Sequence, residues 1–317
     1  MKLTKKTLII AAGLVILYLL GYFGTEAGVI TRLQQVNLMI AGINIIMAVS
    51  LNLIVGFTGQ LNLGHAGFMA VGAYVAAICT AKLDQPFIVA LIAGAVAAGI
   101  VGLIIGIPTL RLRGDYLAIA TLGMGEIIRG ALQNIEYVGA AAGMRDIPHL
   151  TNWSWMFWAV VISCLVVINF INSDHGRACM AVRDNELAAE AVGVNTTYYK
   201  VLAFTIGAML AGLAGGLYAH YFYVIQPGIF SFMRSFDALV MVVFGGLGST
   251  SGAVVAALGV TGLNMALQNL AEMRMVIYAA LLVIIMVFRP QGLMGTKEFT
   301  FDQMLGRPRW HQKGESR

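Results

Sequence analysis

The feature that most constrains this sequence is a set of long segments without any charged side chain. Such segments are Thr7–Thr25, Leu33–Ala81, Gln85–Leu110, Ile147–Ser173, Val201–Met233, Ala238–Ala271 and Met275–Phe288. A helix that crosses the hydrocarbon core of a bilayer needs about 20 apolar residues. Several segments are long enough for one crossing and two are long enough for a pair. The sequence therefore predicts a chain that passes through a membrane many times.

The amino-acid composition indicates the same class of protein. Hydrophobic residues make up 59% of the chain and charged residues 11%, whereas about a quarter of the residues in soluble domains are charged. We predict an all-α polytopic membrane protein with about ten transmembrane helices. The predicted spans are residues 7–23, 36–55, 64–81, 87–107, 116–134, 154–171, 201–222, 236–248, 252–270 and 275–289.

The distribution of basic residues predicts how these helices are oriented. With the N-terminus in the cytoplasm, 14 of the 20 Lys and Arg residues fall in segments that the spans leave on the inner side. Cytoplasmic loops of membrane proteins carry such an excess of basic residues. We therefore predict that both termini are cytoplasmic, and the net charge of +5 needs no nucleic-acid partner to explain it.

The chain is predicted to contain no separate domain outside the membrane. Lysines precede the apolar run 7–23, as in a cleaved signal peptide, but that run is long and no cleavage site followed by a polar domain is evident. We interpret it as a retained first span. Residues 1–295 are predicted to form a single transmembrane domain, and residues 296–317 a polar cytoplasmic tail.

Motifs of enzyme or metal chemistry are absent from the sequence, which contains no GxxxxGK[ST], HExxH or GxSxG. Cys79, Cys164 and Cys179 lie in or beside apolar segments without CxxC spacing, which is typical of packing thiols. An intramembrane enzyme built on His65 or Asp237 lacks a second catalytic group at matched spacing. We predict no enzyme activity, no metal and no cofactor bound by this chain.

Few charges lie near the predicted membrane interior. Glu126 and Arg129 are three residues apart on one predicted helix, the spacing of side chains that face each other. We expect a structural ion pair there rather than a proton relay. The absence of a buried acidic array from the sequence argues against a proton-coupled carrier.

Two apolar regions are interrupted by glycines and polar residues. GFTGQLNLGHAG at 56–67 carries amides and an imidazole within a charge-free run, and FGGLGSTSGAVV at 244–255 is a weaker echo of it. Non-helical backbone at membrane depth is tolerated where it is buried in protein or lines a watery cavity. We predict helix breaks at both places, formed by Gly56, Gly59, Gly64, Gly67, Gly245, Gly246 and Gly248.

The predicted loop at residues 172–200 is the most informative segment outside the membrane. From Arg183 onward, RDNELAAEAVGV predicts a short amphipathic helix with Asp184 or Asn185 as its N-cap and Gly193 as its stop. Its apolar stripe would be Leu187, Ala191 and Val194. A charged helix between two spans suits docking to a cytoplasmic partner, although a solvated loop helix is the alternative.

This loop resembles the coupling loop of ABC importer permeases, with EAVG at 190–193 as a degenerate form of their EAA-and-Gly pattern. Further motifs narrow the resemblance: LNLIVGFTGQLNLGHAGFMAVGAY (51–74), PTLRLRGDYLAIATLGMGEIIR (108–129), GRACMAVRDNELAAEAVGVNTTYYKVLAFTIGAMLAGLAGGLYA (176–219), VVFGGLGSTSGAVVAA (242–257) and FRPQGLMG (288–295). From about residue 40 to 295 the chain is similar to permeases of branched-chain amino acid ABC importers, more to their M than to their H subunit. The segment GAAAGMRDIP (139–148) departs from the family pattern.

The resemblance implies a set of partners in the bacterial inner membrane. These are a second, similar permease in a heterodimer, two cytoplasmic ATPase subunits that use ATP and Mg²⁺, and a periplasmic or lipid-anchored substrate-binding protein. Related permeases carry urea, short amides or other amino acids, which leaves the substrate open. A self-sufficient secondary carrier is the alternative from another class.

Two groups of residues are the candidates for these functions. The candidates for contact with the ATPases are Arg183, Asp184, Glu186 and Glu190, with Gly193 setting the turn. A zwitterion with an apolar side chain needs a path with few hydrogen-bonding groups, and the candidates for that path are Asn44, Asn52, Gln60, Asn62 and His65. The alternative is that these amides join neighbouring helices. Asn44, Asn52 and Gln60 are eight residues apart and would share one face of an uninterrupted helix.

Overall fold

The computed structural model describes residues 5–26, 31–112, 114–267, 280 and 292 of the chain. In these residues the regular secondary structure is helical, apart from an isolated bridge between Met144 and Ile225. The α-helices are α1 (Lys5–Glu26), α2 (Arg32–Thr58), α3 (His65–Ala81), α4 (Phe87–Thr109), α5 (Asp115–Asn134), α6 (Trp153–Asn172), α7 (Asp174–Asp184), α8 (Glu186–Ala191), α9 (Thr196–Phe222), α10 (Phe232–Gly245) and α11 (Thr250–Ala266). Short 3-10 turns are η1 (Glu136–Val138), η2 (Ala140–Ala142) and η3 (Pro227–Phe230).

The all-helical, multi-pass architecture predicted from the charge-free segments is confirmed. By length and composition, α2, α4, α6 and α9 could each cross a membrane, and Gly13–Thr25, α3 and α11 are shorter apolar helices. A helix covers most of each predicted span from 7–23 to 252–270. The predicted span 275–289 and the predicted tail 296–317 lie outside the described residues, so the number of ten spans and the side of each terminus stay predictions.

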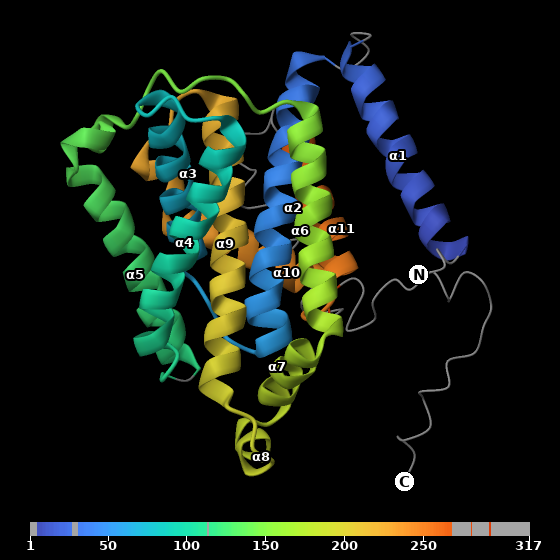
Figure 1. The fold of residues 1–317 in the computed structure, drawn as a ribbon, viewed down its shortest axis with the longest axis vertical. Coiled ribbons are helices and arrows are strands. Elements are labelled where there is room, and N and C mark those ends of the chain that lie inside the picture. Colours follow the sequence, from blue (N-terminus) through green and yellow to red (C-terminus); the bar gives the residue numbers. More distant parts are fainter. Residues whose placement is uncertain (1–4, 27–30, 113, 268–279, 281–291, 293–317) are drawn as a thin grey trace.

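The helices form one bundle with α9 near its centre (Figure 1), where α9 packs most extensively against α3 and α4 and also contacts α2. Protein buries 83% of the apolar stretch of α2 but only 39% of that of α4. The exposed side of α4 carries apolar side chains about one helical turn apart: Ile88, Ile92, Val96, Ile100 and Ile104. Such an apolar surface is what a bilayer would cover.

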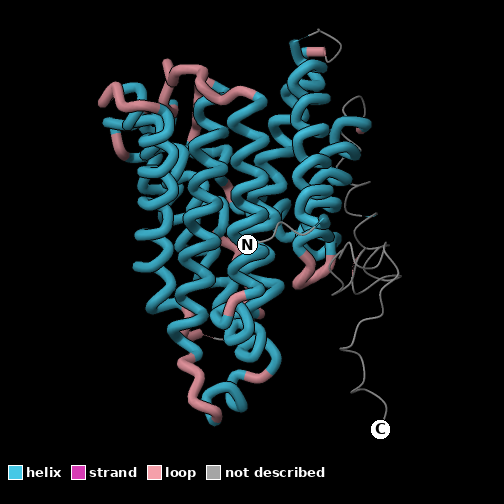
Figure 2. Tube along the Cα trace, turned by 45° about the vertical axis from the view of Figure 1, so that its right-hand side comes forward, coloured by secondary structure: helices cyan, strands magenta, loops and turns pink. Residues whose placement is uncertain are grey.

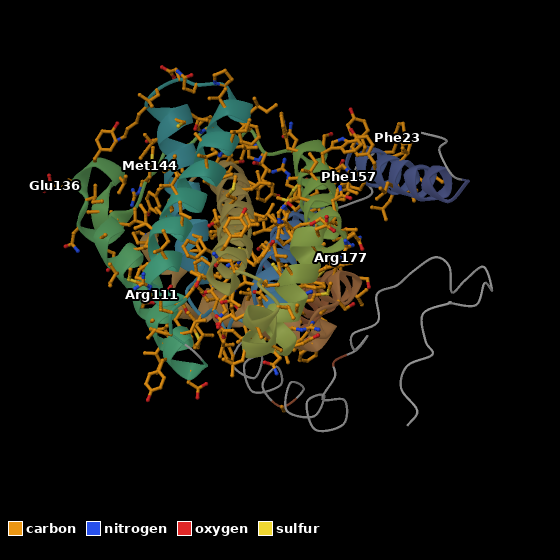
Figure 3. All side chains as sticks on the ribbon, turned by 60° about the horizontal axis from the view of Figure 1, so that its bottom comes forward. Phe23, Arg111, Glu136, Met144, Phe157 and Arg177 are labelled. Carbon is orange, nitrogen blue, oxygen red and sulfur yellow. The ribbon has the colours of Figure 1, made fainter. Side chains whose placement is uncertain are left out.

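Helix α1 lies at the edge of the bundle and leans away from it toward its N-terminal end (Figure 1). Its contact with α6 is aromatic and polar: the rings of Tyr18 and Phe157 are 5.4 Å apart, and the hydroxyls of Tyr18 and Ser154 are 2.9 Å apart. Phe157 lies beside α1 in Figure 3.

The two ends of the bundle differ. Helices α7 and α8 lie at one end, which we call the α7–α8 end, and the segment that joins α5 to α6 lies at the opposite end (Figures 1 and 2). Polar side chains start several helices: Thr31 and Gln34 form a capping box at α2, and Asn195 caps α9. Serine caps start α7 (Ser173) and α11 (Ser249) in the same way.

Close helix contacts at glycine hold α3, α4 and α9 together. A Cβ at Gly72 of α3 would lie 2.2 Å from the carbonyl oxygen of Gly212 in α9, and a Cβ at Gly94 of α4 would lie 2.7 Å from the carbonyl oxygen of Gly72. A Cβ at Gly215 would lie 2.0 Å from the Met69 carbonyl oxygen. These backbones therefore touch without a side chain between them, as small residues allow in membrane helices.

The loop 172–200 differs from its prediction. It forms two helices, because Asn185 adopts an extended conformation and its side chain accepts a hydrogen bond from the Ala188 N–H, which ends α7 and starts α8. Asp184 is the last residue of α7, so its prediction as an N-cap is wrong. The predicted apolar stripe is wrong for Val194, because α8 ends at Ala191; Leu187 and Ala191 lie four residues apart in α8 and are exposed, and the buried residue of α8 is Ala189.

Candidate functional site at two helix breaks

The first break lies between α2 and α3, where residues 59–64 form no helix. The Ser50 hydroxyl and His65 Nε2 are 2.8 Å apart, so α3 begins beside Ser50 rather than beside the end of α2 at Thr58. Ser50 precedes Thr58 by eight residues, which corresponds to about 12 Å along a helix. The segment 59–64 therefore turns back into the bundle, and α3 starts inside it.

Side chains of the first break satisfy the start of α3. The Gly64 N–H donates to Asn62 Oδ1 at 2.9 Å, and the Leu63 N–H donates to the Thr121 hydroxyl of α5 at 3.1 Å. Asn62 Nδ2 lies 3.5 Å from His65 Nδ1. Asn62 and His65 are completely buried. The structure thus brings together two of the residues predicted for a polar path, on a stretch of non-helical backbone inside the bundle.

The start of α10 meets the start of α3. The Ala66 N–H of α3 donates to the Ser235 hydroxyl of α10 at 2.8 Å, and Glu126 Oε1 accepts from the Phe232 N–H at 3.2 Å. Glu126 Oε2 also accepts from Arg129 Nε at 2.7 Å, which confirms the predicted structural pair. Sequence reasoning missed Ser50, Thr121 and Ser235. Ser50 and Thr121 are hydroxyls within apolar stretches, which was their only sequence signal, and Ser235 lies between Arg234 and Asp237 without a signal of its own.

The second break lies between α10 and α11, near the end of α2. Gly246 and Gly248 have φ of 108° and 83°, in the left-handed region that favours glycine. Asn52 Oδ1 accepts from the Gly248 N–H at 3.0 Å, and Asn52 Nδ2 donates to the Ser249 carbonyl at 3.0 Å. One amide of α2 therefore bonds two consecutive residues of this turn.

The glycines predicted for the breaks lie at or beside the ends of these helices. Gly56 is in the last turn of α2 and Gly59 is its C-cap, with φ of 68°. Gly64 is the N-cap of α3 and Gly67 lies in the first turn of that helix. Gly245 ends α10, and Gly246 and Gly248 follow it.

The remaining path candidates are not gathered at one place. Asn44 Nδ2 donates to the Thr261 hydroxyl of α11 at 2.9 Å, about two turns away from Asn52 along α2. Gln60 does not share their helix face, because α2 ends at Thr58 and Gly59 is left-handed. Gln60 is 3% exposed, and neither polar atom of its amide has a hydrogen-bond partner among the described residues.

Helix α7 reaches both breaks through Arg183. Arg183 Nη1 donates to the Gly56 carbonyl at 3.0 Å, while its Nε and Nη2 donate to Asp184 Oδ1 at 2.9 and 2.8 Å. The guanidinium of Arg183 is therefore directed at the bundle. A cavity of about 350 Å³ lies beside it at the α7–α8 end, lined in part by Gln60, Glu186 and Lys200.

Helix α8 is held to α9 along one side. Lys200 Nζ donates to Glu186 Oε1 at 2.5 Å, and the Thr196 hydroxyl donates to Glu190 Oε1 at 2.8 Å. Gly193 follows α8 with φ of 88°. Away from α9, this corner exposes two large apolar side chains, Leu187 at 68% and Val192 at 79%.

Within the described residues, no group of three His, Cys, Asp or Glu side chains is placed to hold a metal ion. The site instead consists of two interrupted helices that meet inside an apolar, multi-pass bundle, with buried amides, hydroxyls and one imidazole. Discontinuous helices of this kind form the binding sites of membrane transporters. Fold and site together define the class of polytopic transport proteins.

The chain belongs to a family within that class. A family model described as "Branched-chain amino acid transport system / permease component" matches residues 36–286. The predicted family resemblance is thereby confirmed. The predicted absence of enzyme activity agrees with the relatives, which are named as transport permeases.

Three relatives illustrate the similarity. The permease protein LivM of Salmonella typhimurium (strain LT2) is 35% identical over 288 residues, which cover 80% of this chain and 68% of the relative. LivM of Escherichia coli (strain K12) has the same identity and coverage. LivH of Escherichia coli (strain K12) is 29% identical over 295 residues, 80% of this chain and 91% of the relative. No solved structure matches the chain significantly.

Proposed function

We propose that this chain is the M-type permease subunit of an ABC importer in a bacterial inner membrane, and that it carries branched-chain or other hydrophobic amino acids by alternating access. Its partners would be a second permease of the H type, two ATPase subunits that bind ATP and Mg²⁺, and a substrate-binding protein. In this proposal the chain itself binds no cofactor, and the α7–α8 end and both termini face the cytoplasm.

The observation that carries the proposal is the first break, whose buried polar residues lie inside an otherwise apolar bundle. An amino acid with an apolar side chain needs a few hydrogen-bonding groups on its path, and strong ionic sites would retain it. Asn62 and His65 offer such groups at and beside the non-helical backbone. The amide of Gln60 forms no hydrogen bond with a described residue. Asn44 and Asn52 join α2 to α11 and to the second break, so we assign them to holding the path together.

The α7–α8 corner supports the coupling part of the proposal. Glu186 and Glu190 are bonded to α9, so a force on α8 would reach a long bundle helix directly. Leu187 and Val192, on the same short segment, are largely exposed apolar side chains. Burial of such side chains by a partner stabilises an interface. We propose that Leu187, Val192 and Glu190 contact an ATPase subunit.

Reconstitution with the partner subunits in proteoliposomes tests the function. We expect uptake of radiolabelled leucine that requires ATP, the ATPases and the binding protein together. Competition by excess isoleucine but not urea would support an amino acid, and the reverse would move the assignment to the related amide permeases. Leucine uptake by this chain alone under an ion gradient, without nucleotide, would indicate the secondary carrier instead.

Charge reversal tests the docking surface separately. Glu190→Lys is expected to weaken copurification of the ATPases and to lower uptake about fivefold or more, because loss of an energetically important interface residue costs more than about 1 kcal/mol of binding free energy. Asp174→Lys is the matched control, since Asp174 is an exposed acid on the neighbouring helix α7. Unchanged uptake and ATPase binding in Glu190→Lys would remove Glu190 from the interface.

A further inference from the structure

We propose that Arg183 is a positioning residue that transmits movement of α7 to both helix breaks. The inference rests on the proposed function, because it concerns how the importer couples ATP hydrolysis to transport. It differs from the role predicted for Arg183 from the sequence, which was contact with an ATPase. Arg183 instead acts within the chain, between the α7–α8 end and the path.

The direction of the guanidinium is the first observation. Asp184 Oδ1 accepts from both Nε and Nη2 of Arg183, which fixes the plane of the group and leaves Nη1 directed at α2. The Arg183 side chain is 31% exposed although α7 lies at the end of the bundle. Arg177, also on α7 and labelled in Figure 3, pairs with Asp174 and is 66% exposed. Two arginines of one helix therefore face different surroundings.

The Gly56 carbonyl is the second observation. In a continuous helix this carbonyl would accept from the N–H of Gln60, four residues on. Here the Gln60 N–H donates to the Ile54 carbonyl at 3.1 Å, because Gly59 is left-handed and α2 has ended. Arg183 Nη1 replaces that donor. A cation also suits the C-terminal end of a helix, where unpaired carbonyls carry partial negative charge.

The contact between the two breaks is the third observation. A Cβ at Gly56 would lie 2.4 Å from the Gly248 nitrogen, and a Cβ at Gly248 would lie 3.2 Å from Arg183 Nη1. The end of α2, the second break and Arg183 thus meet without an intervening side chain. Asn52 ties the same two segments by its two hydrogen bonds. A displacement of Arg183 therefore acts on both breaks together.

The fourth observation concerns the amide of Gln60 within the first break, to which no described residue forms a hydrogen bond. Buried polar groups in proteins nearly always have partners, and an exception calls for an explanation. The amide lies four residues beyond the carbonyl that Arg183 holds. We infer that the break has a second arrangement, in which this amide meets water or substrate, and that Arg183 selects the arrangement described here.

The test compares Arg183→Gln with Arg177→Gln in the reconstituted importer. Both variants remove one positive charge from α7, but Arg177 pairs with Asp174 rather than with the breaks. For Arg183→Gln we expect ATP hydrolysis within about twofold of the unmodified complex and leucine uptake per ATP lowered about fivefold or more, the lower end of a usual coupling energy. Arg177→Gln should keep both values. Arg183→Lys keeps the charge but can reach one acceptor and not two. Its leucine uptake per ATP should lie between that of the unmodified complex and that of Arg183→Gln.

A thiol-protection experiment separates loss of coupling from loss of structure. Cys179 of α7 is buried, with its Sγ 3.7 Å from the Tyr199 carbonyl of α9, and burial raises the pKa of its thiol to about 12. In a Cys79→Ala, Cys164→Ala background, Cys179 should resist maleimide at pH 7 in a correctly placed α7, because little thiolate is present. Protection that persists in Arg183→Gln shows that α7 keeps its position.

Each outcome bears on the inference. Unchanged uptake per ATP in Arg183→Gln with Cys179 protected would overturn it, and so would loss of ATPase binding, which would restore the docking role. If Arg183→Gln fails to assemble, Asp184→Ala provides the measurement, since it removes the oxygen that accepts from Nε and Nη2 and leaves the guanidinium in place. Unchanged uptake per ATP in Asp184→Ala would then overturn the inference. A complex without ATP-driven uptake before any substitution contradicts the proposed function and not the role of Arg183.

Discussion

The two helix breaks are held in different ways. The side chains of the break between α2 and α3 bond to each other and to hydroxyls on neighbouring helices. The break between α10 and α11 has local hydrogen bonds through Ser249, and the Asn52 amide of α2 adds two more from a distant part of the chain. A self-supported turn can present side chains to a ligand, whereas a turn held by a distant residue follows that residue when it moves.

The same chemical group shows the difference most clearly. Asn52 and Gln60 are buried amides only eight residues apart. Both polar atoms of Asn52 are bonded, and neither polar atom of Gln60 has a partner among the described residues. Removal of a bonded buried amide leaves other groups unsatisfied, while removal of an unbonded one does not. Substitutions at the two breaks should therefore differ in both size and kind.

The largest effect is expected where the breaks touch. Gly56→Ala would place a Cβ 2.0 Å from Asn52 Oδ1 and 2.4 Å from the Gly248 nitrogen, so backbone must move. We expect a loss of about 3 kcal/mol in the free energy of unfolding, measured as a lower Tm of the purified protein in detergent. Gly259→Ala on α11 is the control, because its Cβ would meet no described atom within 4 Å. Equal Tm values for both variants would contradict the described contact.

The second effect concerns the support of the α10–α11 break. Asn52→Leu removes two hydrogen bonds and leaves the Gly248 N–H and the Ser249 carbonyl without that amide. We expect a loss of about 2 kcal/mol in the free energy of unfolding, in line with buried groups that lose a partner. Hydrogen exchange at Gly248 should rise together with the fall in Tm. A lower Tm with unchanged protection of Gly248 would place the effect elsewhere.

A smaller effect is expected in the first break, where the hydroxyl of Ser50 bonds His65. Ser50→Ala removes the 2.8 Å contact and leaves His65 Nε2 without that hydroxyl, at a cost of about 1 kcal/mol. Ser163→Ala is the matched control, because the buried Ser163 hydroxyl has no hydrogen-bond partner among the described residues. The free energies of unfolding of the two variants, measured by thermal unfolding, should differ by about 1 kcal/mol. Identical unfolding curves would show that Ser50 does not stabilise the break.

The smallest effect on stability is expected at Gln60. Gln60→Met exchanges an unbonded buried amide for an apolar side chain of similar size, so the free energy of unfolding should change by less than about 0.5 kcal/mol or rise. Uptake of leucine in the reconstituted importer should fall if the amide serves the path. A loss of stability as large as that of Asn52→Leu would erase the contrast between the breaks.

The sequence predicted the helices well because hydrophobicity and charge determine them locally. The charge-free runs contain α2, α3, α4, α6 and α9 almost completely. Glycine chemistry also predicted the position of both breaks, since Gly59, Gly246 and Gly248 adopt backbone angles that other residues rarely take. These features depend on near neighbours in the chain.

The pairing of the breaks could not be predicted in the same way. The contact of Asn52 with Gly248 joins residues 196 positions apart, and that of Arg183 with Gly56 joins residues 127 apart. A charged side chain in a loop gives no local signal that it points into the bundle. The apolar stripe predicted for this loop failed at Val194 for a local reason, because α8 has six residues and ends at Ala191.

The glycine contacts of α3, α4 and α9 also suggest where spectroscopic labels can serve as a reference. Because Gly72, Gly94, Gly212 and Gly215 bring these backbones together, we expect the three helices to move as one rigid body during transport. Spin labels on exposed positions of α4 would then serve as a fixed reference frame. Distances from that frame to labels on α7 and α11 would report any movement of these helices without a correction for motion of the frame itself.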